Sequence, residues 1–279
     1  MAADGFRAPA LADKLNKKRA MSGQQVVRRL KPEEEELARK RVELAAIRAT
    51  LADRELELAD FRRQLAGFEG RYLRQVGTLY AELDEWKARL SELRAKHAPT
   101  PEKKRQSEEA REQARQTWQD SHGDSAKTRD FSPSPELKNL YREVAKRIHP
   151  DFATDAADRE RRTRLMAEAN RAYESGDADA LRRILDEFQD GADAVVGEGI
   201  GAELIRIIRQ IDEARERIAG IEQELANLPQ SEIAKLARDE ESARQNGRDL
   251  LAELAASVQE QIRLAKHEYE LFVAEVQNL

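Results

Sequence analysis

The chain has 279 residues, of which 37% are charged and 5% are aromatic, and its formal net charge is −5. The absence of cysteine excludes disulfides, zinc–thiolate sites and thiol nucleophiles, and the near balance of charge gives no global case for nucleic-acid binding. Helix-forming Ala, Leu, Glu, Arg and Gln dominate, a composition typical of long helices and coiled coils. The sequence therefore predicts an all-α fold.

The N-terminal segment, residues 1–31, is polar and locally basic. It holds eight Lys or Arg residues against Asp4 and Asp13, which predicts a solvated tail that could touch an acidic surface. The segment lacks the apolar core of a secretory signal, and no later apolar run is long enough to span a membrane. We therefore expect a cytoplasmic protein without a membrane partner.

A heptad repeat runs through residues 32–97 and predicts one long coiled-coil helix, about 95 Å in length. One stripe has a member every seven residues: Leu37, Leu44, Leu51, Leu58, Leu65, Tyr72, Leu79, Trp86 and Leu93. A second stripe lies three residues after the first at Ile47, Phe61 and Phe68, and four residues after it at Val76, Leu83 and Leu90. That change resembles the drift of a straight helix against a strict heptad.

The segment 98–133 is rich in Gln, Ser, Asp and mixed charge, which predicts a linker with a short helix around Glu108–Trp118. Residues 200–279 repeat the coiled-coil pattern, with a break near 229–231 where Pro229 stops one helix and Ser231 can cap the next. We expect the N- and C-terminal arms to pair antiparallel within the chain, with residues 130–190 at the far end. Parallel self-association into a homo-oligomer is the alternative.

The segment 134–190 predicts a helical hairpin followed by a third helix. Ser134-Pro135-Glu136 is a helix start, and Pro150 ends that helix because proline cannot donate to the hydrogen-bond ladder. A second helix is expected from about Asp158 to Ser175-Gly176, and Asp177 caps the third. The turn of the hairpin holds His149-Pro150-Asp151, which we expect to be exposed.

These residues resemble the J-domain of DnaJ-type co-chaperones. The family's pattern of Tyr, a basic residue, an aliphatic-Ala pair and His-Pro-Asp is matched by Tyr141, Arg142, Val144-Ala145 and His149-Pro150-Asp151. Its later Glu-Ile-Asn-x-Ala-Tyr stretch is echoed by Glu-Ala-Asn-Arg-Ala-Tyr at 168–173. The resemblance covers about 60 residues, roughly 134–188, and depends on the tripeptide, the basic helix and the spaced Ala-Tyr together.

The resemblance implies a partner rather than a reaction on this chain. J-domains dock on a DnaK-type chaperone ATPase and stimulate its ATP hydrolysis, so no enzyme activity, cofactor or metal is expected here. His149, Pro150 and Asp151 would be the trigger. The basic residues that would meet an acidic groove of the chaperone are Lys138, Arg142, Lys146 and Arg147. The coiled-coil arms would hold an unknown client protein or assembly.

Several residues depart from the family pattern. Glu143 stands where the family usually has a basic residue, which should weaken docking or alter the choice of chaperone. Phe152 replaces the common Lys after the tripeptide. The family's first helix is not visible before Ser134, so another part of the chain must cover the apolar face of the hairpin. Phe131 and the Trp118 segment are the candidates.

The same sequence pattern raises three alternative functions. A metal or hydrolytic site at His149 and Asp151 would need further ligands, but His97, His122 and His267 lie far along the chain. No aromatic stacking platform interleaves with the arginines of the second helix, which argues against nucleic-acid binding. The remaining alternative is a coiled-coil scaffold or adaptor whose degenerate J-like domain stimulates no ATPase. Glu143 and the missing first helix favour it, whereas the intact tripeptide favours a co-chaperone.

Overall fold

A computed structural model describes residues 31–123, 132–189 and 199–277, and every regular element within these ranges is helical. The predicted all-α fold is confirmed. Residues 1–30 of the basic tail, and Phe131, lie outside the described residues. Within the described part of the chain, no helix combines the length and the apolar character that crossing a membrane requires.

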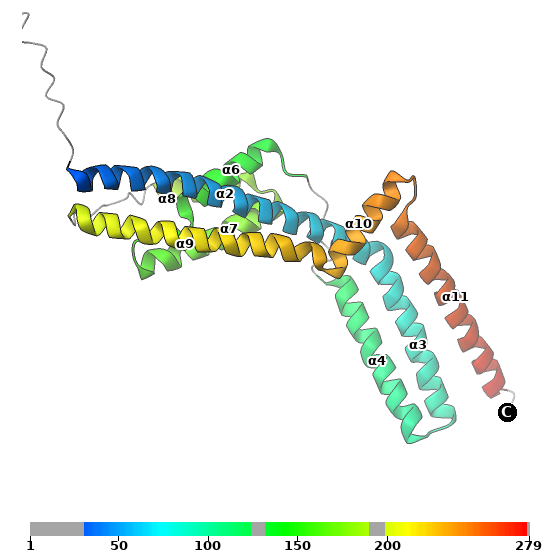
Figure 1. Ribbon diagram of the computed structural model, residues 1–279. Coiled ribbons are helices and arrows are strands. Elements are labelled where there is room, and N and C mark those ends of the chain that lie inside the picture. The colour runs from blue at the N-terminus through cyan, green and yellow to red at the C-terminus, as the bar shows by residue number, and fades with distance from the viewer. Residues whose placement is uncertain (1–30, 124–131, 190–198, 278–279) are drawn as a thin grey trace, which may run out of the picture.

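The helices form two rods that meet at a corner (Figure 1). The proximal rod pairs two long helices, α2 (Pro32–Tyr72) and α9 (Ile200–Asn227). Shorter helices lie on its side: α6 (Pro135–Ile148), α7 (Ala156–Ser175) and α8 (Ala178–Gln189). The distal rod contains α3 (Thr78–His97), α4 (Pro101–His122) and α11 (Leu250–Gln277). Between the rods lies α10 (Glu232–Gln245), which follows the short 3₁₀ turn η3 (Leu228–Gln230).

The two long helices of the proximal rod run parallel. Four buried leucines of the first heptad stripe pack against α9: Leu37, Leu44, Leu51 and Leu58. The ion pairs Arg41–Glu203 and Arg62–Glu224 both join residues 162 positions apart, and a constant offset requires parallel helices in register. The expected antiparallel pairing is therefore wrong, and the described part of the segment expected at the far end, residues 132–189, lies along the rod instead. The reason is that α6 runs back along α2, so that α9 begins beside the start of α2 (Figure 1).

The parallel register can be tested by cross-linking, because the chain has no cysteine of its own. Arg41→Cys combined with Glu203→Cys should give an intramolecular product with a short bismaleimide. The control pair, Arg41→Cys with Glu224→Cys, tests the antiparallel arrangement and should give no product within one chain. Mass spectrometry and denaturing gels separate intramolecular from intermolecular products. A product from the control pair within one chain would contradict the parallel fold.

A π-helical turn, η1 (Leu73–Gly77), joins α2 to α3 at the corner (Figure 1). The buried residues Phe68, Val76 and Leu83 pack against Val258 and Ile262 of α11. Their spacing is eight and then seven, because a π-turn accommodates one extra residue in a helix. The second stripe therefore moves from three to four residues after the first through a local insertion, not through the gradual drift expected from the sequence.

The segment 98–133 contains a longer helix than the short one expected. Helix α4 is capped by Thr100, whose hydroxyl accepts the Lys103 N–H at 3.2 Å, and it returns antiparallel along α3. Small buried side chains let the two helices approach closely: Ala81, Ala88 and Ala95 on α3, and Ala114 and Ser121 on α4. Trp118 is 57% exposed and stacks on His122, with ring centroids 4.7 Å apart.

Candidate functional site

The His-Pro-Asp tripeptide lies in the turn between α6 and α7, where local signals determine the chain path. Ser134 caps α6 by accepting the Leu137 N–H at 3.2 Å, as the sequence predicts. His149 has an extended ψ of 133°, as a residue before proline prefers, and Pro150–Phe152 form a 3₁₀ turn, η2. Asp155 caps α7 by accepting the Asp158 N–H at 2.8 Å, so that this helix begins at Ala156 rather than near Asp158 as expected.

The two helices of the hairpin pack antiparallel through a tyrosine pair. The rings of Tyr141 and Tyr173 lie 4.7 Å apart, and the Tyr141 hydroxyl donates to Asn170 Oδ1 at 2.7 Å. Burial raises the pKa of Tyr141, so that its hydroxyl stays a donor at neutral pH. Val144, Ile148 and other apolar residues of α6, α7 and α8 complete the same cluster.

Helix α2 covers the apolar face of the hairpin for which the sequence indicated no certain partner. It contributes Ala52, Leu56 and Ala59 to the buried cluster of the hairpin. The Tyr173 hydroxyl also donates to a carboxylate of α2, that of Asp60. The Trp118 segment does not take this role, because it packs on α3 in the distal rod, and Phe131 lies outside the described residues.

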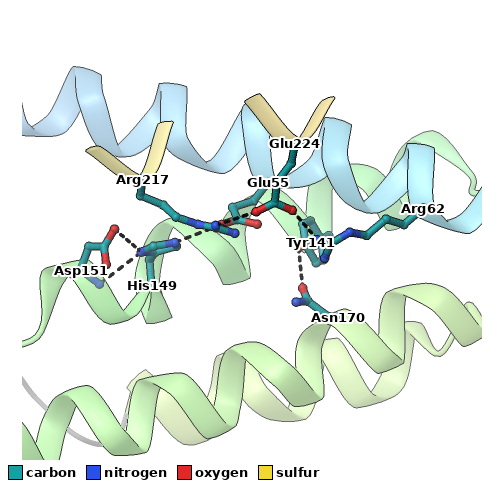
Figure 2. Close-up of polar contacts among 8 residues, drawn as sticks. All are labelled: Glu55, Arg62, Tyr141, His149, Asp151, Asn170, Arg217 and Glu224. Atoms are coloured by element: carbon teal, nitrogen blue, oxygen red, sulfur yellow. Dashed lines mark hydrogen bonds and ion pairs between the residues drawn. The ribbon is translucent and has the colours of Figure 1, made fainter. Parts of the chain in front are cut away.

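The imidazole of His149 is buried, at 2% exposure, between the turn and α2 (Figure 2). Its Nδ1 accepts the Asp151 backbone N–H at 3.2 Å, which assigns the ring proton to Nε2. Nε2 lies 3.3 Å from Glu55 Oε1 and donates to that carboxylate. The expectation that the tripeptide is exposed is therefore wrong for His149, because the long helices of the proximal rod close over the turn.

Glu55 is the central acceptor of a buried polar cluster (Figure 2). Arg217 of α9 donates to it at 2.8 Å, and Arg217 also reaches Glu224 at 3.3 Å. Burial by itself would raise the pKa of Glu55, but the hydrogen bonds from His149 and Arg217 and the positive charge of Arg217 outweigh burial and hold that pKa below its ordinary value. Glu55 is therefore ionised in the folded chain.

The carboxylate of Asp151 is stabilised by fewer hydrogen bonds than that of Glu55. Its Oδ2 is buried and has no hydrogen-bond partner among the described residues, and it lies 3.5 Å from Nδ1 of His149. Burial raises the pKa of Asp151, since the charged carboxylate loses solvation without a donor to replace it. The carboxylate therefore adds little to the stability of this turn.

Phe152 anchors the turn in the seam of the proximal rod. Its side chain, 3% exposed, belongs to the same apolar cluster as Leu51 and Ile211, and the Arg48 guanidinium lies 4.5 Å from its ring centroid. The Phe152 carbonyl also accepts from Gln210 Nε2 of α9 at 3.1 Å. The sequence marked Phe152 only as a departure from the J-domain pattern; its apolar character next to a polar tripeptide was the available signal.

The four basic residues predicted to bind a partner divide into two pairs. Lys138 binds Asp60 at 2.7 Å and Arg142 binds Asp53 at 2.7 Å, so both reach acids of α2. Lys146 and Arg147 are exposed in the last turn of α6, where Arg147 lies 4.0 Å from Glu143. The structure brings His149 and Asp151 together at one turn but does not gather the four cations on one free face.

Among the described residues, no group of three or more His, Cys, Asp or Glu side chains could hold a metal ion. The other histidines lie in the distal rod: His97 contacts Phe272, His122 stacks on Trp118, and His267 is exposed. The tripeptide is thus remote from every other histidine of the chain.

Comparisons with protein families, with characterised proteins and with solved structures give no match to this chain. The function must therefore be argued from the residues of the turn and from what surrounds them.

Proposed function

We propose that this chain is an atypical J-domain co-chaperone that recruits a DnaK-type chaperone and stimulates its ATP hydrolysis through His149-Pro150-Asp151. The observation that carries the proposal is the Asp151 carboxylate. Its Oδ2 is buried without a hydrogen-bond partner among the described residues, and its pKa is raised by burial. A carboxylate that the fold stabilises so poorly is a candidate for function rather than for stability.

Further support comes from the way the hairpin is completed. Helix α2 supplies Leu56 and two alanines to its buried cluster, so the hairpin is a packed unit although the family's first helix is missing. Lys146 and Arg147 are exposed beside the turn and would meet an acidic groove of the chaperone, accelerating encounter. ATP would be bound and cleaved by the partner, while the long rods would hold a client protein or assembly in the cytoplasm.

The proposal predicts that Asp151→Asn abolishes stimulation without loss of stability. Asparagine keeps the shape of Asp151 but removes a carboxylate whose charged form is disfavoured by burial, so the melting temperature should equal or slightly exceed that of the wild type. Single-turnover ATP hydrolysis by a DnaK-type chaperone should rise with the wild-type chain and stay at the basal rate with the variant.

Chain concentrations should be high, because a partly hidden site lowers apparent affinity in proportion to its accessible fraction. His149→Gln should abolish stimulation as well, although its buried position makes a melting curve necessary alongside. The matched control is Asp179→Asn on α8, an exposed carboxylate paired with Arg182 on the same helix. Equal stimulation by Asp151→Asn and wild type would remove the tripeptide from the mechanism.

The burial of His149 favours a second candidate function, a scaffold or adaptor built on the long helices. In that case the tripeptide serves only to join the hairpin to α2 through Glu55, at 3.3 Å. A chain of this kind would stimulate no DnaK-type ATPase at any concentration, while its client binding would survive Asp151→Asn. The ATPase measurement above therefore separates the two functions.

A further inference from the structure

The surface that would dock on the chaperone is occupied by the chain itself. Asp60 and Asp53 of α2 hold Lys138 and Arg142, two of the four cations assigned to docking. Between them on α2, Glu55 holds the His149 imidazole. Acidic groups of α2 thus bind the same side chains that an acidic groove of the partner would bind.

Phe152 fixes this arrangement from the other side of the turn. Its ring is inserted into the seam between α2 and α9, and its carbonyl accepts from Gln210 of α9. The turn cannot leave the rod unless this ring leaves the seam. An aromatic residue at this position therefore acts as an anchor for the adjacent tripeptide.

Helix α2 contributes less apolar surface to the hairpin than it contributes to the seam with α9. Of the described α2 residues, Leu56 is the one large apolar side chain in the hairpin's cluster, whereas four leucines lie in the seam with α9. Since burial energy grows with apolar area, the seam should persist when the hairpin separates.

The buried Glu55 carboxylate also has a partner outside the hairpin. Arg217 of α9 donates to it at 2.8 Å, and this contact does not depend on His149. Leaving a buried charge without a partner is the main free-energy cost of breaking such a cluster. Because Glu55 keeps Arg217 as a partner, the opened state avoids this cost.

We infer that the α2–α9 pair is an intramolecular inhibitor of the hairpin, and that Phe152 is the latch that keeps the His-Pro-Asp turn closed. This inference rests on the proposed function, since it concerns the regulation of the same site. Closed chains bind the chaperone weakly, and opening exposes the tripeptide together with Lys138 and Arg142.

The latch is tested in the full chain with Phe152→Ala, and Phe152→Leu serves as the matched variant that keeps an apolar side chain in the seam. Two readouts are needed: hydrogen exchange of a peptide covering residues 141–155 without chaperone, and single-turnover ATP hydrolysis with chaperone. Phe152→Ala should increase exchange and lower the concentration for half-maximal stimulation about tenfold, in proportion to the open fraction. Phe152→Leu should stay close to wild type in both measurements.

A second variant tests the acidic contacts while leaving every docking residue in place. Asp53→Asn with Asp60→Asn removes both ion pairs to α6, and the new amide of residue 60 can still accept from Tyr173. Half-maximal stimulation should need about fivefold less chain, the effect expected of two modest ion pairs. The control is Glu36→Gln with Glu57→Gln, which removes the same charge from α2 at acids paired within that helix, with Arg39 and Arg54.

These measurements distinguish failure of the latch from failure of the proposed co-chaperone function. Full stimulation by wild type, unchanged by Phe152→Ala, would overturn the latch and leave the co-chaperone function intact. Increased exchange without stimulation by any variant would overturn the co-chaperone function and its regulation together. Unchanged exchange in Phe152→Ala would show that the ring does not hold the turn, whatever the ATPase does.

Discussion

Replacing Leu51 with alanine is expected to lower the free energy of unfolding by about 3 kcal/mol. Leu51 has no exposed surface and lies in the seam between α2 and α9, where the ring of Phe152 joins the same cluster. Truncation removes buried methyl groups and leaves a cavity between two long helices that are held by their other contacts. Urea unfolding followed by circular dichroism gives the change as a shift of the midpoint at constant slope.

The control for this prediction is Val42→Ala on the same helix. Val42 is 72% exposed, so its truncation should change stability by no more than about 0.5 kcal/mol. A loss of similar size in both variants would mean that burial in the seam does not determine the loss, because alanine is the better helix former at both positions. A loss in neither would mean that α2 and α9 do not pair in solution.

The sequence was sufficient where the controlling interactions are local. Ser134 caps α6 through the Leu137 N–H, Ser231 caps α10 through the Ala234 N–H, and Gly176 ends α7 with a positive φ of 76°. Each signal acts within four residues of its own position, so it can be recognised without knowing the fold. The leucines of the first heptad stripe were likewise found as a buried seam from Leu37 to Leu58.

The direction of pairing could not be predicted, because an apolar heptad stripe is the same for parallel and antiparallel partners. The direction of pairing is determined by contacts between distant parts of the chain. Helix α6 returns along α2, and the ion pairs Arg41–Glu203 and Arg62–Glu224 both join residues 162 positions apart. The shift in the second stripe did carry local information. Its extra residue indicates a π-turn at Leu73–Gly77 as readily as a drifting seam.

The buried state of the tripeptide depends on a residue far away in sequence. Glu55 lies 94 positions before His149, and nothing beside His149 indicates such a partner. One signal was present in the second heptad stripe, which has no apolar member between Ile47 and Phe61. Arg54 and Glu55 stand in that gap, and the gap is where a polar group enters the interior.

Replacing Glu55 with glutamine should lower the free energy of unfolding by about 2 kcal/mol at pH 7. Glutamine keeps the length of the side chain but removes the charge that accepts from Arg217 at 2.8 Å and from His149 at 3.3 Å. The loss of stability should be smaller than for a buried ion left without any partner, because Arg217 still pairs with Glu224 in the variant. The measurement is again the urea midpoint, repeated from about pH 3 to pH 8.

The pH dependence gives this prediction its sign. A carboxylate with a folded pKa below its ordinary value stabilises the fold above its unfolded pKa, near 4.3, and loses that contribution as pH falls through the folded pKa. The difference between wild type and Glu55→Gln should therefore be constant above about pH 5 and shrink at lower pH. Glu57→Gln, exposed on the same helix, serves as the control. A difference that grows on acidification would mean that Glu55 is protonated in the fold, and His149 would then be held at this site by something other than a carboxylate.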